Sequence, residues 1–209
     1  MRQGRTTWRE ASWCALDLEL TGLDPDQDEI ISIGAIPIEH GRVALGRSIF
    51  GLVRPVREAS DESIRVHGIR AADLDAAPPL AEAIEPLVRA IDGRALVVHN
   101  AAVERAFLGR AMRAQGLRLR NPSADTEVLG RLWLHERDGE LLSWLPLAEL
   151  AAALGLPAER PHDALGDALT TAQAFIALAA HLEASHRETV GSLCHARRRL
   201  DAVRMFHLG

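Results

Sequence analysis

Two carboxylates end an apolar segment near the start of the chain. Residues 13–19, WCALDLE, carry Asp17 and Glu19 two positions apart. Side chains with this spacing on a strand point to the same face, with Cα atoms roughly 6.5–7 Å apart. Hard divalent cations such as Mg²⁺ prefer carboxylate oxygens, so this pair could hold one ion or bridge two. The pattern is equally compatible with a strand that ends in water, where both acids are solvated.

A third acid follows a second apolar segment. Residues 94–100, RALVVHN, predict a buried strand, and Glu104 lies in the helix expected directly after it. If this strand lies beside the first one, Glu104 approaches Asp17. His99 is expected to fill a polar gap at the strand end. The structural alternative is that Asn100 caps the helix and that Glu104 interacts with its positive N-terminal end.

A histidine and two aspartates open a late helix. Asp163 is a candidate helix cap, and Asp167 lies about one turn further on. A histidine with a pKa near 6.5 can take a proton from water, so His162 could act over a site into which Asp167 points. The alternative is an exposed loop histidine beside an ordinary helix acid. Metal phosphohydrolases also use a His-Asp pair, but their further histidines cannot be assembled from the nine present here.

The elements that must position these residues begin with strands and continue with helices. Residues 13–19, 29–41 and 42–53 predict three antiparallel strands, and the Gly-, Pro- and Asp-rich segment 21–28 predicts a turn after the first. Small residues in the late helix (Ala164, Gly166, Ala168) would allow it to approach another layer closely. A short helix capped by Ser60 or Asp61 is expected, with further helices at about 78–92 despite Pro86, 101–116, 125–135, 146–154, 162–183 and 187–205.

Composition restricts the class of protein. The 209 residues carry a net charge of −5, which excludes a generally basic coat for nucleic acid but not a local basic groove. Two cysteines, Cys14 and Cys194, cannot form a disulfide scaffold and favour a reduced compartment. No signal peptide and no run of 18 apolar residues is visible, which predicts a cytoplasmic protein without a membrane span. One α/β domain is expected over residues 1–209.

In combination, these motifs resemble a known family. Residues 16–36 (LDLELTGLDPDQDEIISIGAI), 97–108 (VVHNAAVERAFL) and 161–168 (PHDALGDA) are similar to the three motifs of the DEDDh group of 3′→5′ exonucleases. The similarity is specifically to chains like the proofreading epsilon subunit of bacterial DNA polymerase III. IRVHGI at 64–69 and ADTEVLGR at 124–131 resemble intervening segments, so the likeness covers roughly residues 12–183.

The resemblance implies a fold and a mechanism. The implied fold is RNase H-like, with a central five-stranded mixed sheet flanked by helices, the first three strands being antiparallel. Two divalent cations, Mg²⁺ or Mn²⁺, would be held by Asp17, Glu19, Glu104 and Asp167, with His162 as the general base. The implied reaction releases nucleoside 5′-monophosphates from a single-stranded 3′ end, with possible association with a DNA polymerase or repair complex.

The chain departs from the family pattern in its second motif. Glu104 stands where the family has Asp, and Val103 replaces the usual aromatic residue before it; Leu20 replaces a common Thr. A glutamate carboxylate reaches about one bond further, and displacements on the order of 1 Å in such a site can cost about a hundredfold in rate. An impaired nucleic-acid-binding module, an RNA-trimming enzyme and a hydrolase of small nucleotides are therefore the alternatives.

Substrate contacts are expected around the turn after the first motif. Leu23 matches a position that wedges against terminal bases in relatives; a turn leucine tucked into the core is the alternative. Thr21, Gly22 and Asn100 are further candidates for substrate binding. His67 either lines the same cleft or has a structural role at a helix end. Tyrosine is one residue type that RNA-trimming relatives use, so within this resemblance its absence here favours DNA over RNA.

Overall fold

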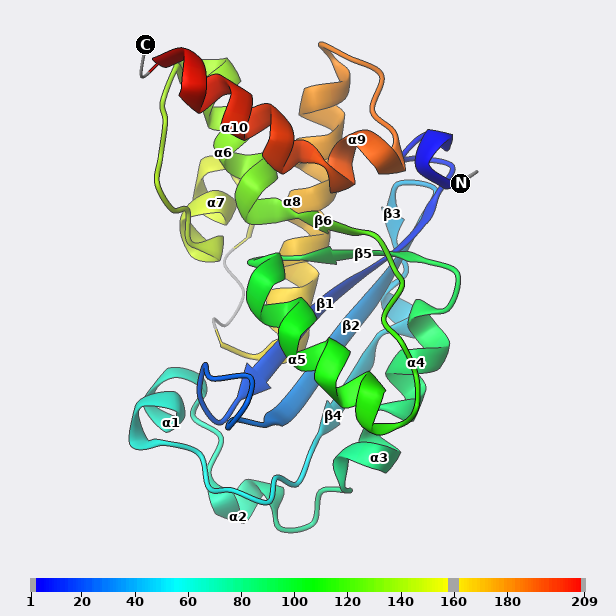
Figure 1. The fold of residues 1–209 in the computed structure, drawn as a ribbon, viewed down its shortest axis with the longest axis vertical. Coiled ribbons are helices and arrows are strands. Elements are labelled where there is room, and N and C mark those ends of the chain that lie inside the picture. Colours follow the sequence, from blue (N-terminus) through cyan, green and yellow to red (C-terminus); the bar gives the residue numbers. More distant parts are fainter. Residues whose placement is uncertain (1–2, 158–161, 208–209) are drawn as a thin grey trace.

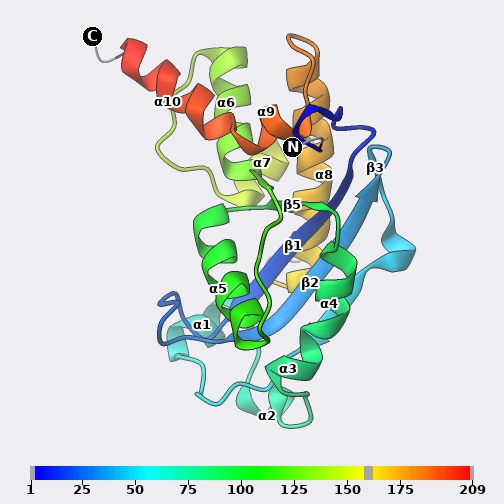
Figure 2. The same cartoon turned by 45° about the vertical axis from the view of Figure 1, so that its right-hand side comes forward.

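A mixed β-sheet with helices on both faces forms the centre of the protein (Figures 1 and 2). The computed structural model describes residues 3–157 and 162–207. The strands lie in the order β3-β2-β1-β5-β6, and β4 also pairs with β2. Their bounds are β1 (Ser12–Leu20), β2 (Ile30–Glu39), β3 (Arg42–Val43), β4 (Ile49–Leu52), β5 (Ala95–Val98) and β6 (Ser123–Asp125).

The sheet confirms the mixed topology expected from the sequence. β1 and β2 are antiparallel, and β5 pairs parallel with both β1 and β6. The third strand predicted at 42–53 is broken into β3 and β4 by a 3₁₀ turn at Leu45–Arg47. Both pieces pair antiparallel with β2, so the described sheet has six strands in place of the five expected.

The helices cover both faces of this sheet. Their bounds are α1 (Asp61–His67), α2 (Ala71–Leu74), α3 (Leu80–Ala83), α4 (Glu85–Ile91), α5 (Ala101–Ala114), α6 (Thr126–Asp138), α7 (Leu147–Ala153), α8 (Ala164–Glu183), α9 (Val190–Cys194) and α10 (Ala196–His207), with a further 3₁₀ turn at Gln3–Arg5. Within the described ranges, no helix has both the length and the apolar character needed to cross a bilayer.

Two predicted helices are each divided in two. The segment 78–92 forms α3 and α4, and Pro86 lies in the first turn of α4, where its missing N–H leaves no hydrogen bond unmade. The segment after residue 187 forms α9 and α10, separated at His195. The helix α2 was not expected from the sequence, α1 begins at Asp61 after the predicted cap Ser60, and α5, α6, α7 and α8 lie within a few residues of their expected ranges.

Alternation along β1 divides the core into two layers. Trp13 and Ala15 pack into the layer formed with α6, α8, α9 and α10, whereas Cys14 and Leu16 pack into the layer with α4 and α5. Successive strand side chains point to opposite faces, so Asp17 and Glu19 continue the row of Trp13 and Ala15. They therefore lie on the face of the sheet that α8 covers.

The start of α8 lies directly against β2 at Gly34. A Cβ atom at Gly34 would lie 2.0 Å from the carbonyl oxygen of Ala164, a separation that packed atoms do not tolerate. Gly34 is also the partner of Asp17 across the β1–β2 ladder. The glycine thus permits the approach that brings the first turn of α8, and Asp167 with it, beside Asp17.

We predict that Gly34→Ala destabilises the protein by about 1–3 kcal/mol, because the added methyl group overpacks the helix–sheet contact. Gly51→Ala is the matched control, because Gly51 pairs with β2 from β4 and has open space where a Cβ would lie. Chemical denaturation of both variants measures the difference. Equal stability of Gly34→Ala and the native protein would contradict the close approach.

Candidate active site

Three carboxylates from two elements converge at the end of β1. Oxygen atoms of Asp17, Glu19 and Asp167 all lie within 4.8 Å of one another. Asp17 and Glu19 come from β1, and Asp167 from the first turn of α8, which Asp163 caps by accepting a hydrogen bond from the amide of Gly166 at 2.9 Å. Carboxylates at this separation suit a hard divalent cation, which prefers several oxygen ligands.

Burial and mutual repulsion raise the pKa of each of these carboxyl groups. The pKa of Asp17 is raised well above its ordinary range, first by burial and then by the charges of Glu104, Glu19 and Asp167. Burial, followed by the charges of Asp167 and Asp163, raises the pKa of Glu19 to about 7. A positive ion among these oxygens would stabilise the ionised carboxylates in place of the water that burial removes. The raised pKa values therefore support a cation site here.

Glu104 reaches this cluster from the opposite side of β1. β5 pairs with β1 at Trp13–Ala15 alone, so the start of α5, rather than a strand, lies beside the end of β1. The backbone amide of Leu18 faces the Glu104 carboxylate. Burial and the charge of Glu19 nevertheless raise the pKa of Glu104 well above its ordinary range. Glu104 is 6% exposed, and its buried Oε2 has no hydrogen-bond partner among the described residues.

Asp125 fixes the start of α5 and hence the position of Glu104. Its carboxylate accepts hydrogen bonds from the amides of Asn100 (3.1 Å) and Ala101 (2.9 Å), and also from the amide of Glu127 in α6. The predicted cap by the Asn100 side chain is therefore wrong. Asn100 instead takes a left-handed backbone conformation (φ 68°), which Asn tolerates better than most residues, and its side chain lines the neighbouring cavity.

A cavity of about 440 Å³ opens beside the carboxylates. The end of β1, α1 and the start of α5 line it. Its walls include four predicted substrate contacts, Gly22, Leu23, His67 and Asn100, and two predicted metal ligands, Glu19 and Glu104. Leu23 is 77% exposed, so the alternative that this leucine is tucked into the core is wrong. Two of the four acids, Glu19 and Glu104, thus share one open cavity with an exposed apolar side chain.

The turn after β1 connects the walls of this cavity. The buried hydroxyl of Thr21 donates to Asp28 at 3.0 Å and accepts from the amide of Glu29, so Thr21 supports the turn and is not among the residues lining the cavity. Its carbonyl accepts from Ser63 of α1 at 2.9 Å. Arg110 of α5 donates to the carbonyls of Pro25 and Asp28 in the same turn.

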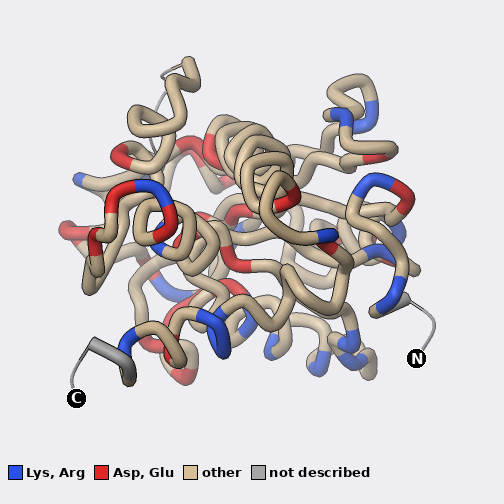
Figure 3. The backbone as a smooth tube through the Cα atoms, turned by 90° about the horizontal axis from the view of Figure 1, so that it is seen from above, with Lys and Arg blue, Asp and Glu red and all other residues tan. Residues whose placement is uncertain are grey.

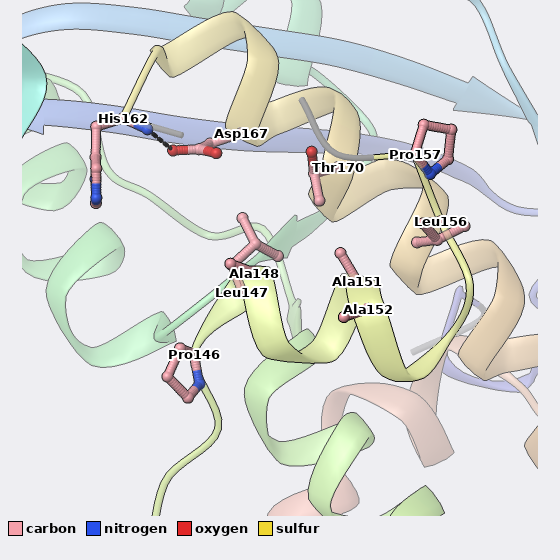
Figure 4. Close-up of a pocket in the computed structure, with 10 residues that line it drawn as sticks. All are labelled: Pro146, Leu147, Ala148, Ala151, Ala152, Leu156, Pro157, His162, Asp167 and Thr170. Atoms are coloured by element: carbon pink, nitrogen blue, oxygen red, sulfur yellow. Dashed lines mark hydrogen bonds between the residues drawn. The ribbon is translucent and has the colours of Figure 1, made fainter. Parts of the chain in front are cut away.

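His162 lies beside Asp167 through its backbone. Its amide donates to Asp167 Oδ2 at 2.8 Å, and its exposed imidazole points away from that carboxylate (Figure 4). The two residues line a second, largely apolar cavity of about 400 Å³ between α7 and α8. The hydrogen bond to Asp167 therefore holds the backbone of His162 beside the carboxylates and does not use its imidazole.

The other two histidines near the cavity have structural contacts. Nδ1 of His67 accepts a hydrogen bond from the amide of Ile69 at 3.0 Å, and burial, followed by the charge of His162, lowers its pKa. His67 therefore both lines the cavity and stabilises the end of α1. His99 bridges the hydroxyl of Thr126 (2.9 Å) and the carbonyl of Leu145 (3.0 Å), as expected for a residue that fills a polar gap.

Three supporting residues were missed by sequence reasoning. Gly34 and Arg110 carry no local signal, because their partners lie on elements distant in the sequence. Asp125 follows an apolar segment and precedes a helix, a cap pattern that was detectable, and its carboxylate does accept from the amide of Glu127. Its bonds to the start of α5 depend on the pairing of β5 with β6.

The charges of the chain are distributed unevenly. Lys and Arg positions lie mostly towards the edge of the view in Figure 3, whereas acidic positions also occur near its centre. All 24 basic residues are arginines. The net charge of −5 is therefore no measure of the field near the cavity.

Comparison with known proteins identifies the family. The exonuclease family profile matches residues 14–175. A DNA polymerase III subunit epsilon-like protein of Rhodobacter capsulatus is 35% identical over 185 residues, or 87% of this chain. A PolC-type DNA polymerase III of Thermotoga maritima is 34% identical over 172 residues, or 82% of this chain. The chain belongs to the exonuclease family.

A solved structure confirms the RNase H-like fold. Exonuclease X in complex with 5′-overhanging duplex DNA matches with a TM-score of 0.66 at 20% identity, over 88% of this chain and 98% of that one. The sequence relatives are much longer proteins: the chain spans 26% of the length of the Rhodobacter protein and 12% of the Thermotoga protein.

We predict that the metal-free protein loses stability as the pH rises from about 4.5 to about 7. The unfolded chain releases the Glu19 proton near pH 4.5 and the folded chain near 7, so the folded state holds more protons in this window. The slope from one such group is about −1.4 kcal/mol per pH unit. Glu19→Gln should remove this contribution and stabilise the metal-free protein at pH 8 by about 1–3 kcal/mol.

Chemical denaturation in a chelator between pH 4.5 and 8 measures this effect, with the exposed Glu149→Gln as the control for a lost surface charge. A Glu19→Gln protein that is less stable than the native one at pH 8 would show that the carboxylate is stabilised in the absence of cations.

Proposed function

We propose that this chain is a metal-dependent 3′→5′ exonuclease that hydrolyses terminal phosphodiesters of single-stranded nucleic acid, preferably DNA, to nucleoside 5′-monophosphates. The observation that carries the proposal is the convergence of Asp17, Glu19 and Asp167 within 4.8 Å at the edge of an open cavity. Because the chain belongs to the exonuclease family, we interpret this acidic cluster as the cation site for phosphodiester hydrolysis.

Asp17, Glu19, Glu104 and Asp167 would hold two divalent cations, Mg²⁺ or Mn²⁺. The unpartnered Oε2 of Glu104 and the raised pKa values of Asp17 and Glu19 support this assignment, because burial and neighbouring negative charge disfavour these carboxylates without a cation. Such cations lower the pKa of a bound water and stabilise charge on the leaving oxygen. The ligand oxygens would come from two Asp and two longer Glu side chains, on β1 itself and on the helices α5 and α8 beside it.

His162 would accept the proton of the attacking water at a ring nitrogen. The bond from its amide to Asp167 keeps the residue beside the acids and leaves both ring nitrogens out of that contact. A ring nitrogen of a neutral imidazole has a lone pair that can accept this proton. Asp167 then has two functions, as a ligand and as the acceptor that positions the general base.

Leu23, Gly22, Asn100 and His67 would contact the terminal nucleotides. The exposed Leu23 side chain offers an apolar surface that can pack against any base, which suits removal of nucleotides without sequence preference. A Cβ on Gly22 would lie 2.4 Å from an Asp28 carboxylate oxygen, so a side chain here would displace the carboxylate that bonds the Thr21 hydroxyl and the Asp24 amide. The buried hydroxyl of Thr21 makes this residue a support for the turn rather than a contact.

Relatives support the choice of partners. Exonuclease X was solved with DNA, and the polymerase III relatives favour a polymerase or repair complex as the setting for this chain. Free Cys14 and Cys194 are compatible with action in the reducing cytoplasm.

Asp17→Asn should lower metal-dependent release of nucleotides from a 5′-labelled oligonucleotide by roughly 10²–10³-fold, because one ligand charge is lost from the cluster. Activity of the native protein should require Mg²⁺ or Mn²⁺ and disappear in a chelator. The exposed Asp138→Asn, which lies at the end of α6, is the matched control. Full activity of Asp17→Asn would refute the mechanism.

Glu104 separates an active enzyme from an impaired binding module. Glu104→Gln should lower the rate by roughly 10²-fold, whereas Glu104→Asp keeps a carboxylate and should support metal-dependent release. The same labelled oligonucleotide measures both variants. An inactive native protein whose activity Glu104→Asp restores would instead establish that this chain is an impaired member of the family.

A further inference from the structure

Trp144 differs from the other tryptophans of the chain. Trp8 and Trp13 are fully buried and pack against Phe175, and Trp133 is buried in the same core layer. Trp144 is 50% exposed and lies in the segment that connects α6 to α7. A large apolar ring in water is unfavourable, and the core does not require it at this position.

The ring of Trp144 lies against a wall of the cavity that contains the acids. It packs edge-on against the imidazole of His99, with ring centroids 6.1 Å apart and an interplanar angle of 69°. His99 itself lines the cavity beside Asn100 and Glu104. Trp144 therefore extends this wall outwards from the strand end.

The backbone around Trp144 is fixed. The carbonyl of the next residue, Leu145, bonds His99 Nε2 at 3.0 Å, and the Leu145 side chain is buried in the core. Pro146 follows at the start of α7 and lines the second cavity together with His162 and Asp167 (Figure 4). Trp144 thus lies between the two cavities that border the carboxylates. Its segment is held by the bond from the Leu145 carbonyl to His99 and by the buried Leu145 side chain.

We propose that Trp144 stacks on a base of the bound single strand, one or more nucleotides before the terminal nucleotide. This inference rests on the proposed nuclease function. A strand whose last phosphodiester reaches the acids must leave the cavity over one of its walls, and the His99–Trp144 wall presents an exposed aromatic ring. Stacking on aromatic rings accepts every base, as an enzyme that removes nucleotides in succession requires.

Trp144 and Leu23 would then have different functions. Leu23 belongs to the turn after β1 and packs at the terminal base, whereas Trp144 lies beyond His99 and holds the strand further from its end. The loss of Trp144 should therefore affect binding of longer strands most strongly. A substrate without a second base, such as the p-nitrophenyl ester of thymidine 5′-monophosphate, cannot use this contact.

Fluorescence and kinetics test the proposal. Saturation of the native protein with an oligo(dT) strand, with Ca²⁺ in place of Mg²⁺ to slow hydrolysis, should quench tryptophan emission; an oligonucleotide with abasic internal positions should quench it less. Trp144→Phe should lose the quench while keeping an aromatic ring.

Trp144→Ala should raise KM for oligo(dT) about 5- to 100-fold, the range expected for one lost base stack. In the same variant, the ratio of kcat/KM for oligo(dT) to kcat/KM for the ester should fall by the factor by which KM rises.

Phe50→Ala is the matched control, because Phe50 is a half-exposed aromatic on β4, outside both cavities. The stacking role would be overturned if the native protein hydrolyses oligo(dT) but its emission is unchanged at saturation, and if Trp144→Ala has an unchanged KM. The nuclease assignment would stand in that case, and Trp144 would be a protein-contact residue. Absence of both hydrolysis and binding in the native protein would refute the nuclease proposal, and the stacking role with it.

Discussion

Repulsion among buried carboxylates is the constraint on which this structure depends. Three negatively charged groups within 4.8 Å, with a fourth at their edge, are unfavourable for a folded chain unless positive charge lies between them. The surrounding core must therefore be strong enough to hold the elements that carry them. Two apolar layers provide this, one with the long helix α8 and one with α4 and α5 (Figure 1).

The carboxylates do not share one rigid element. Asp17 and Glu19 come from a central strand, Asp167 from a helix that touches β2 at Gly34, and Glu104 from a helix whose first amides bond Asp125. The strand and the two helices are positioned by different local contacts. A change in one of these contacts moves the acid or acids of that element relative to the others, and sites of this kind are sensitive to displacements of about 1 Å.

The cavity walls belong to the same system of contacts. The turn after β1 bonds α1 through Ser63 and α5 through Arg110, so the segment that presents Leu23 is connected to the helix that presents Glu104. His99 connects the other wall to the α6–α7 segment. Substrate contacts and cation ligands are consequently positioned together, although they come from distant parts of the chain.

The sequence alone determined the local features: the shared face of Asp17 and Glu19 follows from strand periodicity, and the cap by Asp163 follows from its place before a helix. The order of the motifs also predicted that β5 lies beside β1 and brings Glu104 to Asp17. Only the tertiary structure decided that the Asp125 side chain, and not that of Asn100, bonds the first amides of α5. It decided as well that Thr21 is used inside its turn and that the predicted third strand is broken. It also decided that the imidazole of His162 points away from Asp167 and that Trp144 is exposed beside His99. The physical reason is that strand and helix periods fix the direction of side chains along one element, whereas a partner on another element is set by how the layers pack.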